Sequence, residues 1–130
     1  EYVEDPVSTI EQLHQVRAEL PIPVATDALT PDAESIKQVI SMGVVNNIIL
    51  KPLLLGGIDS VIALSNVARS AGITSVISST FDGPVGLTSW CHLASAIGPN
   101  TTHGIGTAGL IDDKRMRPLI PRNGVIELSS

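Results

Sequence analysis

The sequence predicts an α/β fold built on a parallel sheet, and two observations support this prediction. Short aliphatic runs alternate with segments of helical periodicity, and the unit recurs about every 25 residues, the length of one strand-helix unit. Hydrophobic residues make up 43% of the 130 residues but aromatic residues only 2%, so aliphatic side chains must fill the core. Such a composition is typical of strands buried on both faces. Strands separated by helices at this spacing are parallel, with right-handed crossovers.

Each element is expected from a local signal. Strands are predicted over residues 1–5, 23–27, 47–51 and 74–79, and a further short strand near His103. The first helix is expected to begin at Ser8, which opens a Ser-x-x-Glu capping box, and to end before Pro21. The second is expected to begin near Thr30, with Pro31 at its first position.

The later elements follow from glycine and proline signals. The second helix is expected to end at Gly43 and the third at Gly72, and the fourth is expected to run from Pro84 to Gly98. The tail over residues 115–130 holds turn signals, and residues 125–128 are predicted to add a short strand outside the sheet.

Polar residues close several of the predicted strands. Glu4, Asp27, Lys51 and Ser79 each end an apolar run and precede a turn rich in proline or glycine. Polar groups from consecutive strand ends converge on one face in a (β/α)₈ barrel, which typically needs about 250 residues. Four to five strands in 130 residues therefore predict about half of such a barrel.

Three of these residues form a charged set that can carry chemistry. Glu4, Asp27 and Lys51 lie one strand-helix unit apart, so in a barrel they are expected side by side. Taken singly, each is readily explained as a helix cap or an ion-pair member. Their common spacing favours a shared site, because an isolated charge at a buried strand end is costly unless it is paired or binds a metal. Two carboxylates suit Mg²⁺ but leave its ligand set incomplete.

Composition excludes several other classes of function. The net charge of −5 and the scattered basic residues argue against nucleic acid as a partner. The single cysteine, Cys91, excludes an internal disulfide framework and suggests a reducing compartment. No apolar run reaches the roughly 20 residues that span a bilayer, so a membrane is not expected. Residues 1–5 carry no targeting pattern, and the chain is expected to begin inside a larger barrel.

The strand-end motifs resemble a known family. Residues 2–6 (Tyr-Val-Glu-Asp-Pro), 22–27 (Ile-Pro-Val-Ala-Thr-Asp) and 49–52 (Ile-Leu-Lys-Pro) resemble the fourth, fifth and sixth barrel strands of the enolase superfamily, muconate-lactonizing subgroup. Residues 76–87, 92–94 and 103–107 resemble the seventh strand, helix and eighth strand of o-succinylbenzoate synthases within it. The resemblance implies that residues 1–130 are the C-terminal part of a catalytic barrel, about strands four to eight. The N-terminal capping domain and the first barrel strands would then lie outside the chain.

The resemblance also implies roles for individual residues. Glu4 and Asp27 would bind Mg²⁺, with Mn²⁺ as an alternative ion, and Lys51 would be the sixth-strand lysine, a cation facing the enolate. Ser78 and Ser79 would hold a carboxylate of the substrate through backbone N–H groups at a helix start, and Gly104 would line the same site. Two departures are visible, since Ala28 follows Asp27 where the family usually has glutamate, and Asp82 stands where glutamate is common.

The function implied is that of o-succinylbenzoate synthases. These are Mg²⁺-dependent lyases that carry out a syn dehydration of a hydroxycyclohexadiene carboxylate, through an ene-diolate, in menaquinone biosynthesis. The base would be a second-strand lysine, which has no counterpart in this chain, so the 130 residues alone are expected to be inactive. The partners expected are a small-molecule carboxylate and either the missing barrel half or another copy, with a homo-oligomer and a cytoplasmic location as further expectations.

Several alternatives stay open. A muconate-type cycloisomerase uses the same scaffold, and a dipeptide epimerase is disfavoured because residues 104–106 (Gly-Ile-Gly) offer no carboxylate for the ammonium group of a dipeptide. A non-catalytic half-barrel that is stable only with another chain is a third possibility. Residues 104–109 fit a Gly-x-Gly-x-x-Gly pattern, but the prolines at 118 and 121 leave no room for the long helix of a dinucleotide site.

Overall fold

Strands and helices alternate along the chain in the computed structural model, which describes residues 1–128. The four strands are β1 (Val3–Glu4), β2 (Val24–Thr26), β3 (Asn47–Leu50) and β4 (Thr74–Ile77). They alternate with helices α1 (Ile10–Glu19), α2 (Ala33–Met42), α3 (Ile58–Ser70) and α4 (Pro84–Ile97). Two 3₁₀ helices follow, η1 (Gly106–Leu110) and η2 (Lys114–Leu119). The predicted α/β alternation is confirmed.

The sheet is parallel, and its order in space is β1-β2-β3-β4, the same as the order in the chain. A doubly wound sheet reverses direction part-way, whereas a barrel wall adds each strand to the same side of the last. An isolated parallel bridge from Ser78 to Gly104 extends the sheet by one more position. The short strand predicted near His103 is thus reduced to a single bridge, formed by Gly104, the next residue in the chain.

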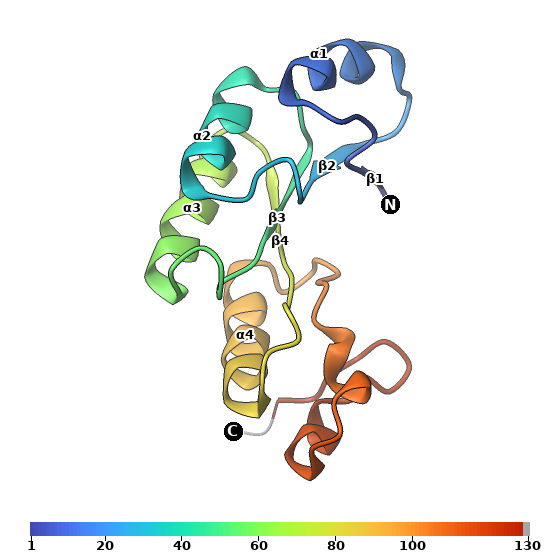
Figure 1. Ribbon diagram of the computed structural model, residues 1–130, viewed down its shortest axis with the longest axis vertical. Helices are drawn as coiled ribbons and strands as arrows, with labels where there is room; N and C mark the ends of the chain where they lie inside the picture. Colours follow the sequence, from blue (N-terminus) through green and yellow to red (C-terminus); the bar gives the residue numbers. More distant parts are fainter. Residues whose placement is uncertain (129–130) are drawn as a thin grey trace.

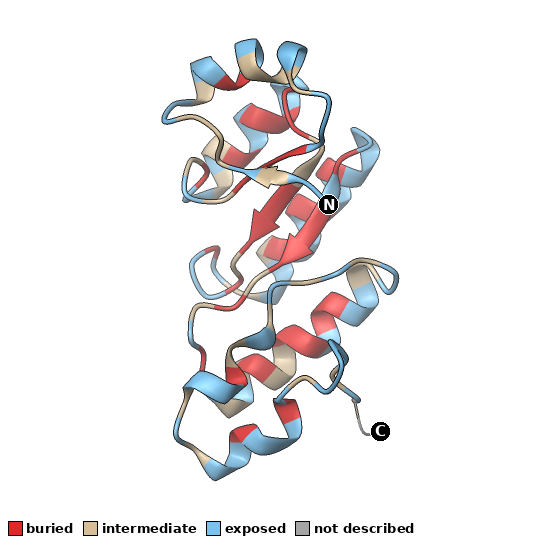
Figure 2. Ribbon diagram, turned by 90° about the vertical axis from the view of Figure 1, so that its right-hand side faces the viewer, coloured by how far each residue is buried: buried red, intermediate tan, exposed pale blue. Residues whose placement is uncertain are grey.

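The two faces of the sheet differ in what covers them. Figure 1 shows α2 and α3 along one side of β3 and β4, and Figure 2 shows that the buried residues lie along these strands and on the helix sides toward them. Val24, Ile48 and Ile77 join the main core cluster with the helices. Because side chains alternate along a strand, the residues adjacent to these three face the other way. They are Ala25, Ile49 and Val76, which form a cluster of their own on the face opposite the helices, here called the inner face.

The N-cap of helix α1 lies one residue later than predicted. Its N-cap is Thr9, whose hydroxyl accepts a hydrogen bond from the Gln12 N–H at 3.4 Å, and the Ser8 N–H donates to the Gln12 side chain at 3.2 Å. The prediction that the helix begins at Ser8 is therefore wrong. Threonine caps nearly as well as serine, and the path of the chain from β1 decides between them.

Helix α2 also begins later than predicted. Asp32 is its N-cap and forms a capping box with Ser35, so Thr30 and Pro31 precede the helix. The Thr30 side chain is buried and its hydroxyl donates to the Thr26 hydroxyl at 3.3 Å. Thr30 is thus engaged with β2 and cannot cap the helix, which is why the predicted start is wrong.

The other helix limits agree with the sequence. Gly43 ends α2 with a φ of 64°, Gly72 follows α3 with a φ of 74°, and α4 has Pro84 in its first turn and Gly98 as its C-cap. Glycine is favoured at the first two positions because a positive φ costs other residues free energy.

The tail packs as loops and 3₁₀ turns. Arg122 and Val125 form one antiparallel bridge around the turn, but residues 125–128 form no strand, so that prediction is wrong. The side chains of Ile126 and Leu128 instead pack against a second core cluster that contains Cys91. Ser129 and Ser130, the end of the predicted tail, lie outside the described residues. No helix of residues 1–128 has the length and apolar character needed to cross a membrane.

Candidate metal and substrate site

Asp27 and Lys51 meet at the carboxyl ends of β2 and β3. Each lies two residues beyond an inner-face residue, Ala25 or Ile49, so the alternation of the strand points it to the same face. The Lys51 Nζ donates to the Asp27 Oδ2 at 2.5 Å, and the two side chains are 26% and 20% exposed. Partial burial makes this contact stronger than a typical surface ion pair.

Glu4 ends β1 on the same side of the sheet. Its register partner is Ala25, an inner-face residue, which places the Glu4 side chain on the inner face as well. Glu4 is an exposed residue, but its partial desolvation still raises the pKa of the carboxyl, the charges of Asp27 and Asp5 raise it further, and Lys51 acts in the opposite direction. Hydrogen bonding with the Asp27 side chain acts in the same upward direction on the Glu4 pKa, as the smallest of these effects.

Tyr2 lies near the same two carboxylates. Burial raises the pKa of the Tyr2 hydroxyl, and the Glu4 and Asp27 charges add to this shift. Glu4, Asp27 and Lys51, predicted from their spacing to lie together, are thus neighbours, with an excess of negative charge around them. Such an excess favours a bound cation.

The donor set fits part of a Mg²⁺ site. Mg²⁺ prefers oxygen ligands in octahedral geometry and is commonly held by one or two carboxylates together with water and substrate oxygens. Glu4 and Asp27 supply two carboxylates, and a cation between them would relieve their repulsion. Within residues 1–128 there is no group of three or more His, Cys, Asp or Glu side chains that could hold a metal ion. A third protein ligand would have to come from outside these residues.

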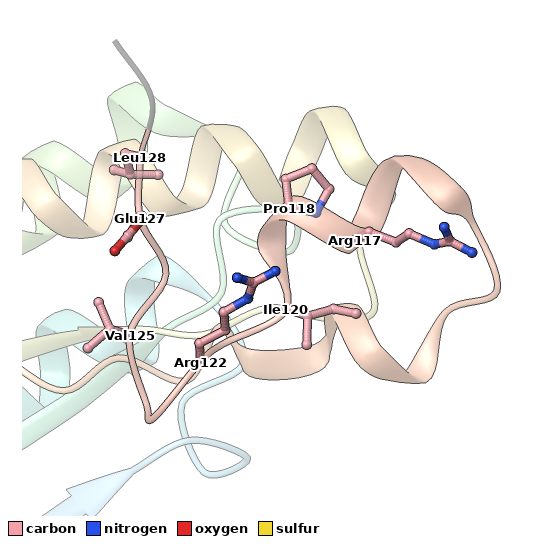
Figure 3. A pocket seen from close by; sticks show the side chains of 7 residues that line it. All are labelled: Arg117, Pro118, Ile120, Arg122, Val125, Glu127 and Leu128. Carbon is pink, nitrogen blue, oxygen red and sulfur yellow. The ribbon is translucent and has the colours of Figure 1, made fainter.

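A small pocket adjoins the Asp27 and Lys51 pair. Its volume is about 90 Å³, and its walls combine the ion pair with apolar side chains; it is lined by Asp27, Ala28, Thr30, Pro31, Ile49, Lys51, Leu54 and Leu55. A larger pocket of about 430 Å³ lies in the C-terminal segment (Figure 3). In Figure 3 the guanidinium groups of Arg117 and Arg122 point in different directions, so they do not converge on one ligand. The paired charges favour the smaller pocket as the site.

Ser78, Ser79 and Gly104 meet beyond the end of β4. The Ser78 N–H donates to the Leu50 carbonyl at 2.9 Å and the Ser79 N–H to the Gly104 carbonyl at 3.0 Å. These two backbone donors, expected to hold a carboxylate, are therefore already used by the sheet. The Ser79 hydroxyl contacts the Thr107 hydroxyl at 2.9 Å, and the Ser78 hydroxyl lies 3.4 Å from the Gly104 carbonyl. Hydroxyl groups are what these serines can offer to a ligand.

Gly104 lies close against Ser78. A Cβ atom at Gly104 would lie 3.0 Å from the Ser78 Oγ and 3.3 Å from its Cβ. A larger residue at position 104 would therefore require Ser78 to shift by a few tenths of an ångström. Gly104 therefore brings the last position of the sheet next to Ser78, and it adds no side chain to the site.

Two positioning contacts were not predicted from the sequence. The Asp5 carboxylate accepts hydrogen bonds from the Asp27 N–H at 3.1 Å and the Ala28 N–H at 2.7 Å. The His103 Nδ1 accepts from the Ile77 N–H at 3.0 Å, and its Nε2 lies 3.0 Å from the Gly98 carbonyl. An acidic residue directly after Glu4 was the one sequence signal for the first contact. The second had no signal, because it joins residues far apart in the chain.

Comparison with known proteins places these features in a family. The family described as enolase C-terminal domain-like matches residues 1–130, the whole chain. The chain belongs to this family. It is 34% identical over 128 residues to the o-succinylbenzoate synthase of Mycobacterium ulcerans (strain Agy99). That alignment covers 97% of this chain but 38% of the relative, so this enolase-family chain spans well under half of the relative's length.

Solved structures of the enolase superfamily have the same fold. A dipeptide epimerase from Enterococcus faecalis V583 is 25% identical, with a TM-score of 0.78, over 87% of this chain and 34% of the epimerase chain. An enolase from Gibberella zeae PH-1, complexed with magnesium, formate and sulfate, is 26% identical with a TM-score of 0.69. It matches over 75% of this chain and 23% of its own. The predicted superfamily and its barrel-type α/β fold are confirmed.

Proposed function

We propose that this enolase-family chain is the C-terminal part of the barrel of an o-succinylbenzoate synthase. The reaction would be a Mg²⁺-dependent syn dehydration of a hydroxycyclohexadiene carboxylate, a step of menaquinone biosynthesis in the cytoplasm. The identity of 34% to the Mycobacterium ulcerans enzyme supports this substrate class. The observation that carries the proposal is the meeting of Glu4, Asp27 and Lys51 on one face of the sheet, joined by the contact of Lys51 with Asp27.

Glu4 and Asp27 would hold Mg²⁺, with Mn²⁺ as an alternative ion. Their oxygen donors suit either ion, and the Gibberella zeae relative is complexed with magnesium. When bound, the ion would offset the negative charge that develops on the substrate carboxylate as a proton leaves the adjacent carbon and an ene-diolate forms.

Lys51 would act as a fixed positive charge toward the substrate. Its ammonium group is oriented by Asp27, and the partly buried pair is shielded from full solvent screening. A preoriented cation stabilises developing negative charge without reorganisation during the reaction. The proton would be removed by a lysine of an earlier strand, outside this chain. The 130 residues alone would therefore be inactive and would need the rest of the barrel.

The small-molecule carboxylate would extend from the charged residues toward Ser78. The Ser78 side chain is partly exposed, and its hydroxyl is free to exchange its long contact with the Gly104 carbonyl for a ligand oxygen. Ser79 is buried and bonded to Thr107, so its contribution would be to hold the Gly104 segment in place. Gly104 would border the ligand without covering it.

Dipeptide epimerisation is the second candidate, favoured by the TM-score of 0.78 to the Enterococcus faecalis enzyme. Against it, residues 104–106 read Gly-Ile-Gly and offer no carboxylate to pair with a substrate ammonium. A buried ammonium without such a partner would be costly. A muconate-type cycloisomerase would use the same charged residues, so only an activity assay distinguishes it from the proposed dehydratase.

The test is an assay of the complete gene product that contains this sequence. With Mg²⁺, it should dehydrate the hydroxycyclohexadiene carboxylate and show little dipeptide epimerisation or muconate cycloisomerisation. Preferential turnover of a dipeptide or of a muconate would replace the proposal with the corresponding alternative. Size-exclusion chromatography of the 130 residues alone should show self-association, because the open sheet leaves unpaired edges. A monodisperse monomer would contradict the expected self-association. The same measurement on the complete protein would show whether it forms a homo-oligomer.

A further inference from the structure

The Asp5 carboxylate joins the ends of two neighbouring strands. Each of its two oxygens accepts one hydrogen bond: Oδ1 from the Asp27 N–H at 3.1 Å and Oδ2 from the Ala28 N–H at 2.7 Å. Both donors belong to the backbone that leaves β2, and Asp5 itself directly follows β1. One side chain thus ties the end of β1 to the turn that carries Asp27.

The backbone of Asp5 adopts a conformation that serves this contact. Its φ is 43°, in the left-handed region, where residues other than glycine are uncommon and aspartate and asparagine are among the most tolerated. The Asp5 N–H still donates to the Ala25 carbonyl at 3.0 Å, so strand pairing continues to this residue. Pro6 follows and has no N–H to extend it. Such a strained position persists where the surrounding contacts hold it.

Asp27 is consequently held at two points. Lys51 contacts its carboxylate, and Asp5 holds the backbone N–H at the same residue and the next. Lys51 is a long, flexible side chain, so by itself it orients the carboxylate but does not fix the main chain. Asp5 supplies that second restraint, and it directly follows Glu4 in the chain.

We propose that Asp5 is a positioning residue, which holds the Asp27 backbone so that the carboxylates of Glu4 and Asp27 converge on one cation. This inference rests on the proposed function for the identity of the cation, Mg²⁺. It goes beyond that function in assigning a role to a side chain that is bonded to the backbone of the turn and is not one of the proposed metal ligands. Outer contacts of this kind, when lost, typically weaken metal affinity about 10- to 100-fold.

A matched control exists in the same chain. The Asp32 carboxylate also accepts two backbone hydrogen bonds, from Glu34 at 3.0 Å and Ser35 at 2.8 Å, but it does so at the start of α2. Asp32→Ala should lower the melting temperature without changing Mg²⁺ affinity, whereas Asp5→Ala should weaken Mg²⁺ binding about 10- to 100-fold. Asp5→Asn keeps one acceptor oxygen and should give an intermediate loss.

The experiment uses the complete gene product and two measurements. Calorimetric titration with Mg²⁺ gives the affinity of each variant, and hydrogen exchange of the peptide that contains Asp27 and Ala28 reports their N–H groups directly. Weaker Mg²⁺ binding with faster exchange in the Asp5 variants, and neither change in Asp32→Ala, would support the proposal. Should Asp5→Ala fail to fold, Asp5→Asn decides by the same two readings.

Two results would overturn the inference. One is unchanged Mg²⁺ affinity in folded Asp5 variants, and the other is an equal loss in Asp32→Ala, which would show a general effect of stability. Failure of the proposed function is distinguishable, because the unsubstituted protein would then not dehydrate the hydroxycyclohexadiene carboxylate, whether or not it binds Mg²⁺. In that case, unchanged hydrogen exchange at Asp27 and Ala28 in the Asp5 variants would still refute the positioning role. Faster exchange would support the part of the inference in which Asp5 holds the Asp27 backbone.

Discussion

The two ends of the candidate site are held together in different ways. At the end formed by Glu4, Asp27 and Lys51, charged side chains contact one another, as in the bond between Lys51 and Asp27. At the end formed by Ser78 and Gly104, strand-like backbone bonds and a close approach at glycine determine the geometry. The first end should respond to charge and pH, and the second to side-chain volume.

The largest expected effect is on the charged end. In the complete gene product, Lys51→Ala should lower kcat by about 10²- to 10³-fold, the usual cost of losing an oriented electrostatic contact. Lys37 is an exposed lysine of α2, and Lys37→Ala is the control, with activity expected to stay unchanged. Steady-state kinetics with Mg²⁺ measure both variants. Full turnover by Lys51→Ala would show that the charge of Lys51 has no part in the reaction.

The second prediction concerns the end formed by Ser78 and Gly104. Gly104→Ala places a Cβ atom 3.0 Å from the Ser78 Oγ, so Ser78 must shift by a few tenths of an ångström. Overpacking of this kind lowers the free energy of unfolding by about 1–3 kcal/mol. Gly109→Ala is the control, because a Cβ atom there meets nothing within 4 Å. Urea denaturation of both variants measures the difference, and equal stability of the two would contradict the steric argument.

The third prediction concerns the His103 imidazole, which contacts β4 next to Ser78. His103→Ala removes the acceptor for the Ile77 N–H and should lower the free energy of unfolding by about 0.5–1.5 kcal/mol. His92 is exposed on α4, so His92→Ala should change stability less. Hydrogen exchange should also become faster at Ile77 in the first variant only. Unchanged protection of the Ile77 N–H would mean that His103 is not its main partner.

The smallest effect is a pH dependence at Glu4. Its pKa is raised above the ordinary value of 4.5 by burial and by neighbouring carboxylates, so the folded state favours the protonated form. The resulting stabilisation is complete at low pH, below 4.5, and is lost as pH rises through the raised pKa. Without divalent ions, the stability of the unsubstituted protein relative to Glu4→Gln should therefore fall as pH increases over this range. A flat difference in urea denaturation would rule the shift out.

Local sequence signals predicted much of the fold. The aliphatic runs placed all four strands, and Gly43, Gly72 and Gly98 marked helix ends, because propensity and backbone freedom act within a few residues. Helix starts were less certain. Thr9 and Asp32 cap α1 and α2, although Ser8 and Thr30 are also capping residue types. The choice depended on tertiary contacts such as that of Thr30 with Thr26.

By itself, the sequence determined that polar residues end successive parallel strands, and so that Glu4, Asp27 and Lys51 would share one edge of the sheet. Only the tertiary structure decided which atoms meet. The bonds of Asp5 to the turn after β2 and of His103 to Ile77 join residues 22 to 26 positions apart. Such contacts depend on strand register and on the close approach of chain segments, which arise from packing the whole core rather than from any local signal.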